Sequence, residues 1–224
     1  ELPPVDDVQY GDISACSVSQ KVPESGLLFE SSAVSAEGSS DYYQYKGRYI
    51  VTSMKSGLMM IDQHRAHIRV LYQRYLAQLS EQGCASQGVL FPEILTVSMS
   101  QSVVMEQLLE DFLRLGFDIS NMGGGSYAIQ TVPVDLEGIN PIRLVSDMLN
   151  DAIEKGNVSK DEIHQSLALT MARSAAIVVG QVLSLNEMSV LIDELFACEV
   201  PAYTPNGKKI FTIISEDEIG ERFS

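Results

Sequence analysis

Residues 57–67 read Gly-Leu-Met-Met-Ile-Asp-Gln-His-Arg-Ala-His, and the expected fold is most easily worked out from here. Leu58–Ile61 is a short apolar run of the kind found in a buried strand. From Ala66 to Leu79 the apolar residues recur at helical spacing. Asp62 therefore lies where a strand ends and a helix begins. Carboxylates and imidazoles at such junctions often have functional roles, because the strand holds them rigidly.

The residues before this stretch predict two more strands and an arm. Tyr42–Tyr45 and Tyr49–Thr52 are rich in strand formers and are separated by a turn-like Lys-Gly-Arg. Residues 1–39 are rich in Ser, Gly, Pro, Glu and Asp, which is typical of a flexible linker, with one short strand expected at 26–29. We expect the globular part to begin near Asp41.

The residues after it alternate between strands and helices. Ser100 is the expected N-cap of the first of these helices and Gly116 its C-terminal stop, while Ser184 or Asn186 caps a later one. Ser215 and Glu218 form a capping-box pattern. The expected elements are strand 89–97, helix 100–115, a hairpin of 117–120 and 127–132 around a triple glycine, helices 141–155, 160–178 and 184–199, strand 209–214 and helix 215–223. This order predicts an α+β (mixed α/β) fold.

Composition excludes several classes of protein. The chain has 224 residues, of which 45% are hydrophobic, so it can bury a core and is not disordered throughout. No apolar run approaches the roughly 20 residues of a membrane span, and no signal peptide is recognisable. The three cysteines are scattered without the spacing of a disulfide framework or a zinc site. We therefore expect a cytoplasmic protein without a membrane partner.

Charge is distributed unevenly along the chain. The net charge of −15 argues against general nucleic-acid binding, which needs a basic surface. Residues 41–80 are the exception, with six Lys or Arg and two Asp. Arg65, Arg69 and Arg74 of the predicted helix are therefore candidate DNA contacts, although solvated arginines on one helix face explain the pattern equally well.

Asp62, His64 and His67 are the candidate metal ligands in the chain. A hydrolytic metal site needs three or four ligands, and no nearby Glu or Cys completes this set. The simpler interpretation is structural: Asp62 caps the helix, and the imidazole beside it has an ordinary hydrogen-bond partner. The triple glycine at 123–125 is not a phosphate loop, since no Lys-Ser/Thr follows it.

Four ordered stretches resemble the C-terminal domain of the MutL family of DNA mismatch repair proteins. Residues 57–67 are similar to its apolar strand followed by Asp-Gln-His-Ala and a helix. Residues 171–176 correspond to its Ala-Cys-Arg-Ser-Ala helix, 195–201 to its Leu-Phe-x-x-x-x-x-Pro stretch, and 204–209 to its Cys-Pro-His-Gly-Arg-Pro stretch. The similarity extends from about Tyr42 to Phe223.

The chain departs from this family at the positions that bind metal in nicking-competent members. Asp62, Gln63 and His64 are retained as a vestigial motif. The remaining motif positions are occupied by Arg65, Ile68, Gln73, Ala172, Thr204 and Asn206. Five positions that would hold divalent metal are thus poor ligands or none, so we expect no catalytic residues, no metal and no tightly bound zinc.

The resemblance implies a homodimerisation domain with two lobes. It places a dimerisation lobe at 40–98 and 161–224 and an inserted regulatory lobe at 99–160. It implies coordination of MutS, the DNA polymerase sliding clamp and a separate nuclease in the bacterial cytoplasm. DNA, ATP and Mg would be bound by the full-length protein and no cofactor by this domain. The alternative is a nicking endonuclease whose metal site is rebuilt from Asp62, His64 and Glu199 or Glu218.

Residues 87–92, Gln-Gly-Val-Leu-Phe-Pro, resemble the sliding-clamp-binding peptide of bacterial MutL. Such a peptide inserts a Gln amide and two apolar anchors into a preformed pocket. Gln87, Leu90, Phe91 and Pro92 are the expected contacts. The alternative is an ordinary strand in which Leu90 and Phe91 are core residues.

Overall fold

The computed structural model describes residues 42–80, 85–136, 138–156 and 158–224. The linker expected at 1–39 and the short strand expected at 26–29 lie outside these residues. The elements, in chain order, are β1 (Tyr42–Tyr45), β2 (Tyr49–Met54), β3 (Gly57–Asp62), α1 (Gln63–Ser80), β4 (Ser86–Thr96), α2 (Met99–Arg114), β5 (Asp118–Gly123), β6 (Ser126–Pro133), a 3₁₀ turn (Val134–Leu136), α3 (Pro141–Lys155), α4 (Lys160–Ala175), α5 (Leu185–Ala197), β7 (Phe211–Ser215) and α6 (Glu216–Glu221).

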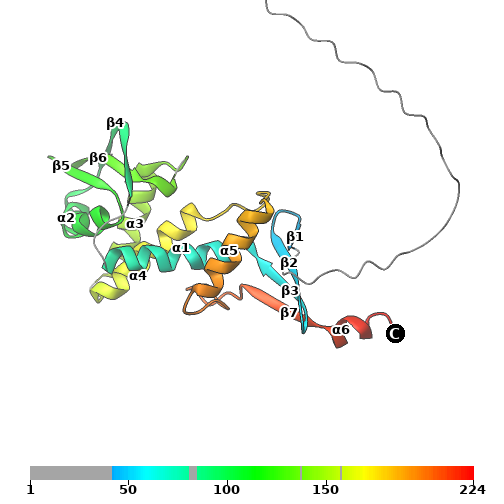
Figure 1. Cartoon of the computed structure of the whole chain (residues 1–224). Coiled ribbons are helices and arrows are strands. Elements are labelled where there is room, and N and C mark those ends of the chain that lie inside the picture. The colour runs from blue at the N-terminus through cyan, green and yellow to red at the C-terminus, as the bar shows by residue number, and fades with distance from the viewer. Residues whose placement is uncertain (1–41, 81–84, 137, 157) are drawn as a thin grey trace, which may run out of the picture. The chain divides into compact units, whose positions relative to one another are not determined.

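The first sheet has the order β1-β2-β3-β7 and is antiparallel throughout. Because side chains alternate along a strand, Ile50, Met59 and Ile61 all point to one face, where they are buried. On that face they pack with α5 and the first turns of α1. In Figure 1, β7 lies beside β3 although residues 63–210 separate them in the sequence.

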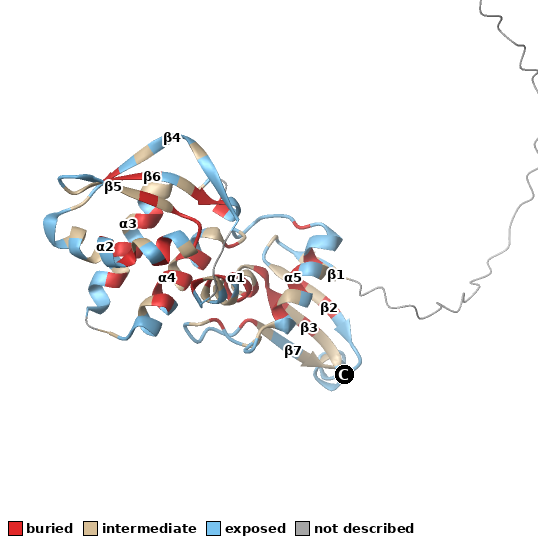
Figure 2. Cartoon of the chain, turned by 60° about the vertical axis from the view of Figure 1, so that its left-hand side comes forward, coloured by how far each residue is buried: buried red, intermediate tan, exposed pale blue. Residues whose placement is uncertain are grey.

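The second sheet has the order β4-β6-β5 and packs against α2 and α3. Its core includes the fully buried rings of Phe112 and Phe117, which meet edge to face. The same core continues through α4 to the second half of α1, where Tyr75 and Leu79 are buried. Helix α1 therefore packs at its start on the first sheet and at its end on the second core (Figure 2).

The sequence predicts these elements well and their ends less well. The α+β class is confirmed, as is the capping box at Ser215, and of the two expected caps of α5 the structure selects Ser184 over Asn186. The predicted cap at Ser100 is wrong: Ser98 caps α2, because Gln101 stands three residues after it and completes a capping box. Helix α4 ends at Ala175, three residues before the predicted end.

Strand β4 belongs to the second sheet. The boundary expected at residue 99 separates this strand from β5 and β6, whereas β4 pairs with β6 on both sides of residues 89–92. The change from one sheet to the other therefore comes before Ser86. The sequence of a strand does not indicate its pairing partner, so only the structure groups β4 with β5 and β6, and the lobe boundary itself stays a prediction.

Candidate functional site

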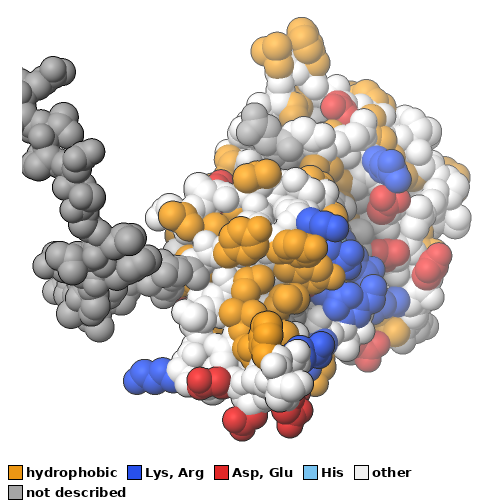
Figure 3. Space-filling model, turned by 90° about the vertical axis from the view of Figure 1, so that its right-hand side faces the viewer, with side chains coloured by type: hydrophobic (Ala, Val, Ile, Leu, Met, Phe, Trp, Pro, Cys, Tyr) orange, Lys and Arg blue, Asp and Glu red, His pale blue; other side chains and the backbone are white. Residues whose placement is uncertain are grey.

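The first sheet presents an apolar outer face, opposite the face that packs on α5. Cross-strand register aligns Tyr43, Val51, Met60 and Thr212 in one row, and Leu58 with Ile214 in the next. Tyr43 is 65% exposed. Figure 3 looks onto this side of the molecule and shows hydrophobic side chains gathered there, with Lys and Arg side chains along one border. We call this surface the outer sheet face.

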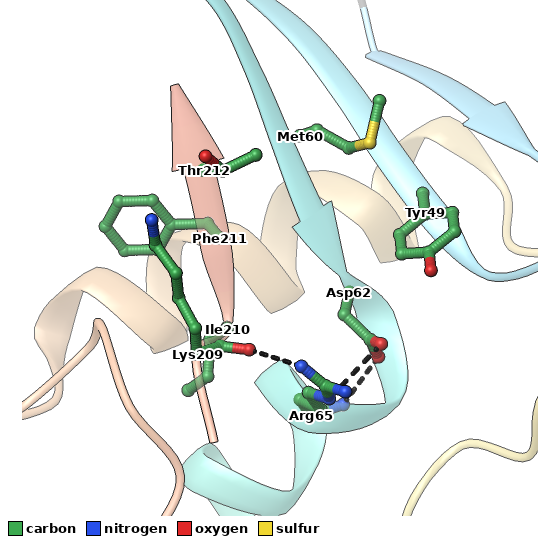
Figure 4. A pocket seen from close by; sticks show the side chains of 8 residues that line it. All are labelled: Tyr49, Met60, Asp62, Arg65, Lys209, Ile210, Phe211 and Thr212. Atoms are coloured by element: carbon green, nitrogen blue, oxygen red, sulfur yellow. Dashed lines mark hydrogen bonds and ion pairs between the residues drawn. The ribbon is translucent and has the colours of Figure 1, made fainter. Parts of the chain in front are cut away.

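A small pocket lies where the outer sheet face meets the start of α1. Its lining includes Tyr49, Met60 and Thr212 from the sheet and Arg65 from the helix. Figure 4 shows the Arg65 side chain turned towards Asp62. The guanidinium of Arg65 also donates to the carbonyl oxygen of Lys209 at 2.7 Å, which ties α1 to the segment before β7. The basic border of the sheet face is thus fixed in position.

The carboxylate of Asp62 is held by cations of the chain itself. Asp62 is only 7% exposed, and its Oδ2 lies 3.4 Å from Nε of Arg65 and 3.8 Å from Nε of Arg48. Its Oδ1 accepts the backbone N–H of Arg65 at 3.1 Å, which satisfies a free donor of the first helical turn. These contacts provide both the countercharge and the hydrogen bond that a buried carboxylate needs.

Gln63 is fully buried and joins three segments. Its amide nitrogen donates to the carbonyl oxygens of Gly47 at 2.7 Å and Gln181 at 3.0 Å. Its amide oxygen accepts a hydrogen bond from Gln44 at 2.6 Å. The middle residue of the vestigial motif therefore ties the β1–β2 turn and the α4–α5 connection to the start of α1.

His64 and His67 bind the backbone carbonyl and the backbone N–H of the same residue, Ile177. Nδ1 of His64 donates to the carbonyl oxygen of Ile177 at 2.7 Å, because a carbonyl can only accept. Nδ1 of His67 accepts the N–H of Ile177 at 2.9 Å, so this nitrogen carries no proton. Burial, reinforced by the charge of Arg74 and by His64, lowers the pKa of His67 to about 4, although Asp135 opposes the shift. Both imidazoles are thereby committed to holding the α4–α5 connection.

The other positions that the resemblance assigns to a metal site hold no suitable ligands. Ile68 and Ala172 are buried in the second core, and the Gln73 amide oxygen accepts the backbone N–H of Glu199. The hydroxyl of Thr204 donates to Asn206 within the loop before β7. Among the described residues, no three His, Cys, Asp or Glu side chains gather as a metal-binding group. This donor set does not fit a divalent metal, which needs several anionic or imidazole ligands.

The three arginines proposed as DNA contacts differ in their surroundings. Arg69 is only 8% exposed, which argues against a DNA contact there. Arg74 pairs with Glu194 at 3.1 Å and Asp135 at 3.7 Å, so its charge is already neutralised. Arg65 lines the pocket beside the outer sheet face, but its guanidinium is likewise engaged, by Asp62 at 3.4 Å and by the carbonyl oxygen of Lys209. Helical periodicity places residues 65 and 69, which are four apart, on one face and residue 74 on another, which the count of positive charges did not show.

Residues 89–92 form a bulge on the edge strand β4 (Figure 2). Gly88 pairs with Thr131 and Glu93 with Ile129, so four residues of β4 stand opposite Gln130 alone. At the top of the bulge, Leu90 is 88% exposed and Phe91 is 78% exposed. The interpretation of these two side chains as core residues is therefore wrong.

An antiparallel sheet that carries apolar side chains on both faces, with a helix layer over only one of them, defines a protein-association domain. Residues 42–183 match the sequence pattern of the MutL C-terminal dimerisation domain. The chain belongs to this family of DNA mismatch repair domains.

Relatives named DNA mismatch repair protein MutL align along most of the chain. That of Bacteroides fragilis is 50% identical over 215 residues, 96% of this chain and 34% of the relative. That of Phocaeicola vulgatus is 50% identical over 194 residues, 87% of this chain and 31% of the relative. The chain thus spans about a third of the length of these relatives. Among the described residues, no helix is long and apolar enough to cross a membrane.

Proposed function

We propose that two copies of this chain associate through the outer sheet face. The run Leu58–Ile61 has the continuous apolar character of a strand covered on both sides. Helices of the chain cover one side, on which Met59 and Ile61 are buried, whereas Leu58 and Met60 on the other side remain partly exposed. A second copy supplies the missing layer, and this unmatched apolar face is the observation that carries the proposal.

Dimerisation would join two much longer proteins at their ends. By resemblance, the remaining two thirds of each relative would contain the ATPase, with its ATP and Mg, and would close around DNA. In this proposal the domain holds the two arms together in the bacterial cytoplasm, where MutS and a separate nuclease take part in repair. The rigid attachment of α1 to the first sheet by Asp62 and Gln63 suits such a role.

The domain acts by association and does not cut DNA. The nicking alternative needs Asp62 and His64 as ligands, but an ion pair with Arg65 and a hydrogen bond to Ile177 already engage them. Glu218, a candidate further ligand, accepts the N–H of Ser215 in the last capping box. Manganese-dependent nicking of supercoiled plasmid by the full-length protein, lost in Asp62→Asn, would contradict this proposal.

The dimer is tested by placing a charge on the outer sheet face. Met60→Glu introduces a carboxylate at the centre of the proposed contact, where its desolvation would strongly oppose association. Met122→Glu is the matched control, because Met122 is 65% exposed and lies in β5 of the other sheet. In light scattering at micromolar concentration we expect the parent and Met122→Glu to be dimers and Met60→Glu to be a monomer of 24.6 kDa. A parent that is monomeric would refute the proposal.

The bulge on β4 supports a second function, docking to the sliding clamp. Exposed Leu90 and Phe91 have no packing role of their own, and the bulge presents them next to Gln87 on an edge strand. An apolar pair of this kind fits the preformed apolar pocket of a clamp. Because both side chains are exposed, their truncation tests binding without damaging the core.

Clamp affinity should therefore depend on the bulge. Phe91→Ala is expected to lose about 2 kcal/mol of binding, roughly 30-fold in affinity, and Gln87→Ala about 1–2 kcal/mol. Ile94→Ala is the control, since Ile94 is 51% exposed on the same strand but outside the bulge. Calorimetric titration of the parent and the three variants with the bacterial clamp measures these differences. Equal affinities would leave the bulge without this function.

A further inference from the structure

Arg69 is a buried cation that has no carboxylate partner in the described part of the chain. Its side chain leaves α1 at mid-length and is only 8% exposed. Within the described parts of the chain no Asp or Glu oxygen lies within ion-pair distance of its guanidinium, and its buried Nε donates no hydrogen bond. Its one ring contact is with Tyr72, whose centroid lies 5.7 Å from Cζ. A buried charge in this state is unfavourable unless something else compensates it.

Two nearby groups do not neutralise this charge. The thiol of Cys198 shares a hydrogen bond with the Arg69 side chain, but burial raises the pKa of this thiol, so it brings no negative charge at neutral pH. Gln73 lies one helical turn after Arg69, but its side chain is an uncharged amide. The oxygen of that amide accepts the backbone N–H of Glu199. Arg74, on the same helix, shows the contrast, since it holds two carboxylates.

Arg69 lines a groove that runs along one side of α1. Tyr72, Leu76 and Ala77 give this groove apolar walls, Gln73 and Ser80 give it hydrogen-bonding groups, and Glu199 stands at its edge. The residues of α1 recur at intervals of three and four, so they form a single face of the helix. The groove thus combines a guanidinium that meets no carboxylate among the described residues with polar and apolar contacts on either side.

We propose that this groove binds a carboxylate group of an acidic peptide segment from a partner protein, with Arg69 as its counterion. A planar guanidinium matches a planar carboxylate through paired hydrogen bonds. Leu76, Ala77 and the Tyr72 ring would contact apolar residues beside the acidic one. A phosphate group fits less well, because its extra charge would meet the exposed carboxylate of Glu199 at the groove.

The site is tested by following the Nε–H resonance of Arg69 in ¹⁵N-labelled chain, assigned with Arg69→Lys. The probes are sodium acetate, a blocked Leu-Asp-Leu tripeptide, its Leu-Asn-Leu counterpart and inorganic phosphate, each against sodium chloride at equal ionic strength. We expect a saturable shift with acetate, at least fivefold tighter binding of the Leu-Asp-Leu peptide, and no saturable response to Leu-Asn-Leu.

Two variants separate this site from its alternatives. In Arg69→Met, which keeps the length of the side chain, acetate and the acidic peptide should no longer raise the melting temperature as they do in the parent. In Glu199→Gln the response should persist. A shift that follows ionic strength alone, or phosphate binding tenfold tighter than the acidic peptide, would overturn the proposal. A response found only in Glu199→Gln would also overturn it, since Glu199 would then occupy the site in the parent.

Discussion

Acidification is expected to weaken the fold through His67. Its neutral ring accepts the Ile177 N–H at Nδ1, and a proton on that nitrogen would abolish the bond. Burial lowers the pKa of His67 from 6.5 to about 4, so the folded state binds a proton less readily than the unfolded chain. This contribution to stability is therefore complete above about pH 6.5 and is lost as the pH falls towards 4.

The size of the loss follows from the two pKa values. Linkage gives a decrease of about 1.4 kcal/mol in the free energy of unfolding at pH 5.5, and about 3 kcal/mol once the pH is below 4. We choose pH 5.5 for the measurement because the isoelectric point is near 4.5, where a protein without net charge tends to associate. At pH 8 the contribution of His67 to the pH dependence is negligible.

Urea unfolding of the parent and His67→Asn, at pH 8 and pH 5.5 and at one protein concentration, isolates this effect. The asparagine amide oxygen can still accept the Ile177 N–H, but it does not titrate in this range. All other ionisable groups are shared, so their contributions cancel when the two proteins are compared. The parent should lose about 1.4 kcal/mol more than the variant between the two pH values. Parallel pH dependence of the parent and the variant would show that the His67 imidazole is not held neutral by the fold.

Three further substitutions test the packing around the site by thermal or urea unfolding. Gly57→Ala should cost about 2–3 kcal/mol, since φ is 141° and a Cβ would stand 2.1 Å from the carbonyl oxygen of Ile214; a stability equal to that of the parent would mean that β3 and β7 can separate freely. Asp62→Asn should cost about 2 kcal/mol by removing the ion pairs with two arginines, and raising the salt concentration should reduce this difference if charge is the cause. Ser184→Ala should cost about 1 kcal/mol through loss of the α5 cap, whereas an unchanged melting temperature would assign that capping box no energetic role.

The sequence predicts most of the elements because local signals determine them. Strand β3 and helix α1 follow from a change of hydrophobic period, and Ser184 and Ser215 are recognisable as caps from the glutamate three residues on. The bulge on β4 could not be predicted, since Val89–Pro92 has the same apolar composition as a buried strand. Only the pairing with β6 shows that these residues are displaced from the ladder.

The candidate site shows the same division between local and long-range information. Asp62 was correctly placed at a strand–helix junction, where local patterns suffice. The burial of Arg69 and the ion pairs of Arg74 depend on residues more than 50 positions away, on segments such as Glu194–Cys198. The apolar outer sheet face had a signal in the sequence, the continuous apolar run Leu58–Ile61, but that run alone does not say whether the second covering layer belongs to the same chain.

The three residues of the vestigial motif, Asp62, Gln63 and His64, all stabilise the fold. Asp62 caps α1, Gln63 joins the β1–β2 turn to the α4–α5 connection, and His64 holds the carbonyl of Ile177. All three contacts hold segments of the folded chain together. The fold therefore uses these side chains whether or not a metal is bound. Ile68 and Ala172, at positions that the resemblance assigns to metal ligands, are instead buried in the second core. Retention of Asp-Gln-His is therefore explained by packing and hydrogen bonding in this chain, and it is weak evidence for nuclease activity unless the remaining ligands accompany it.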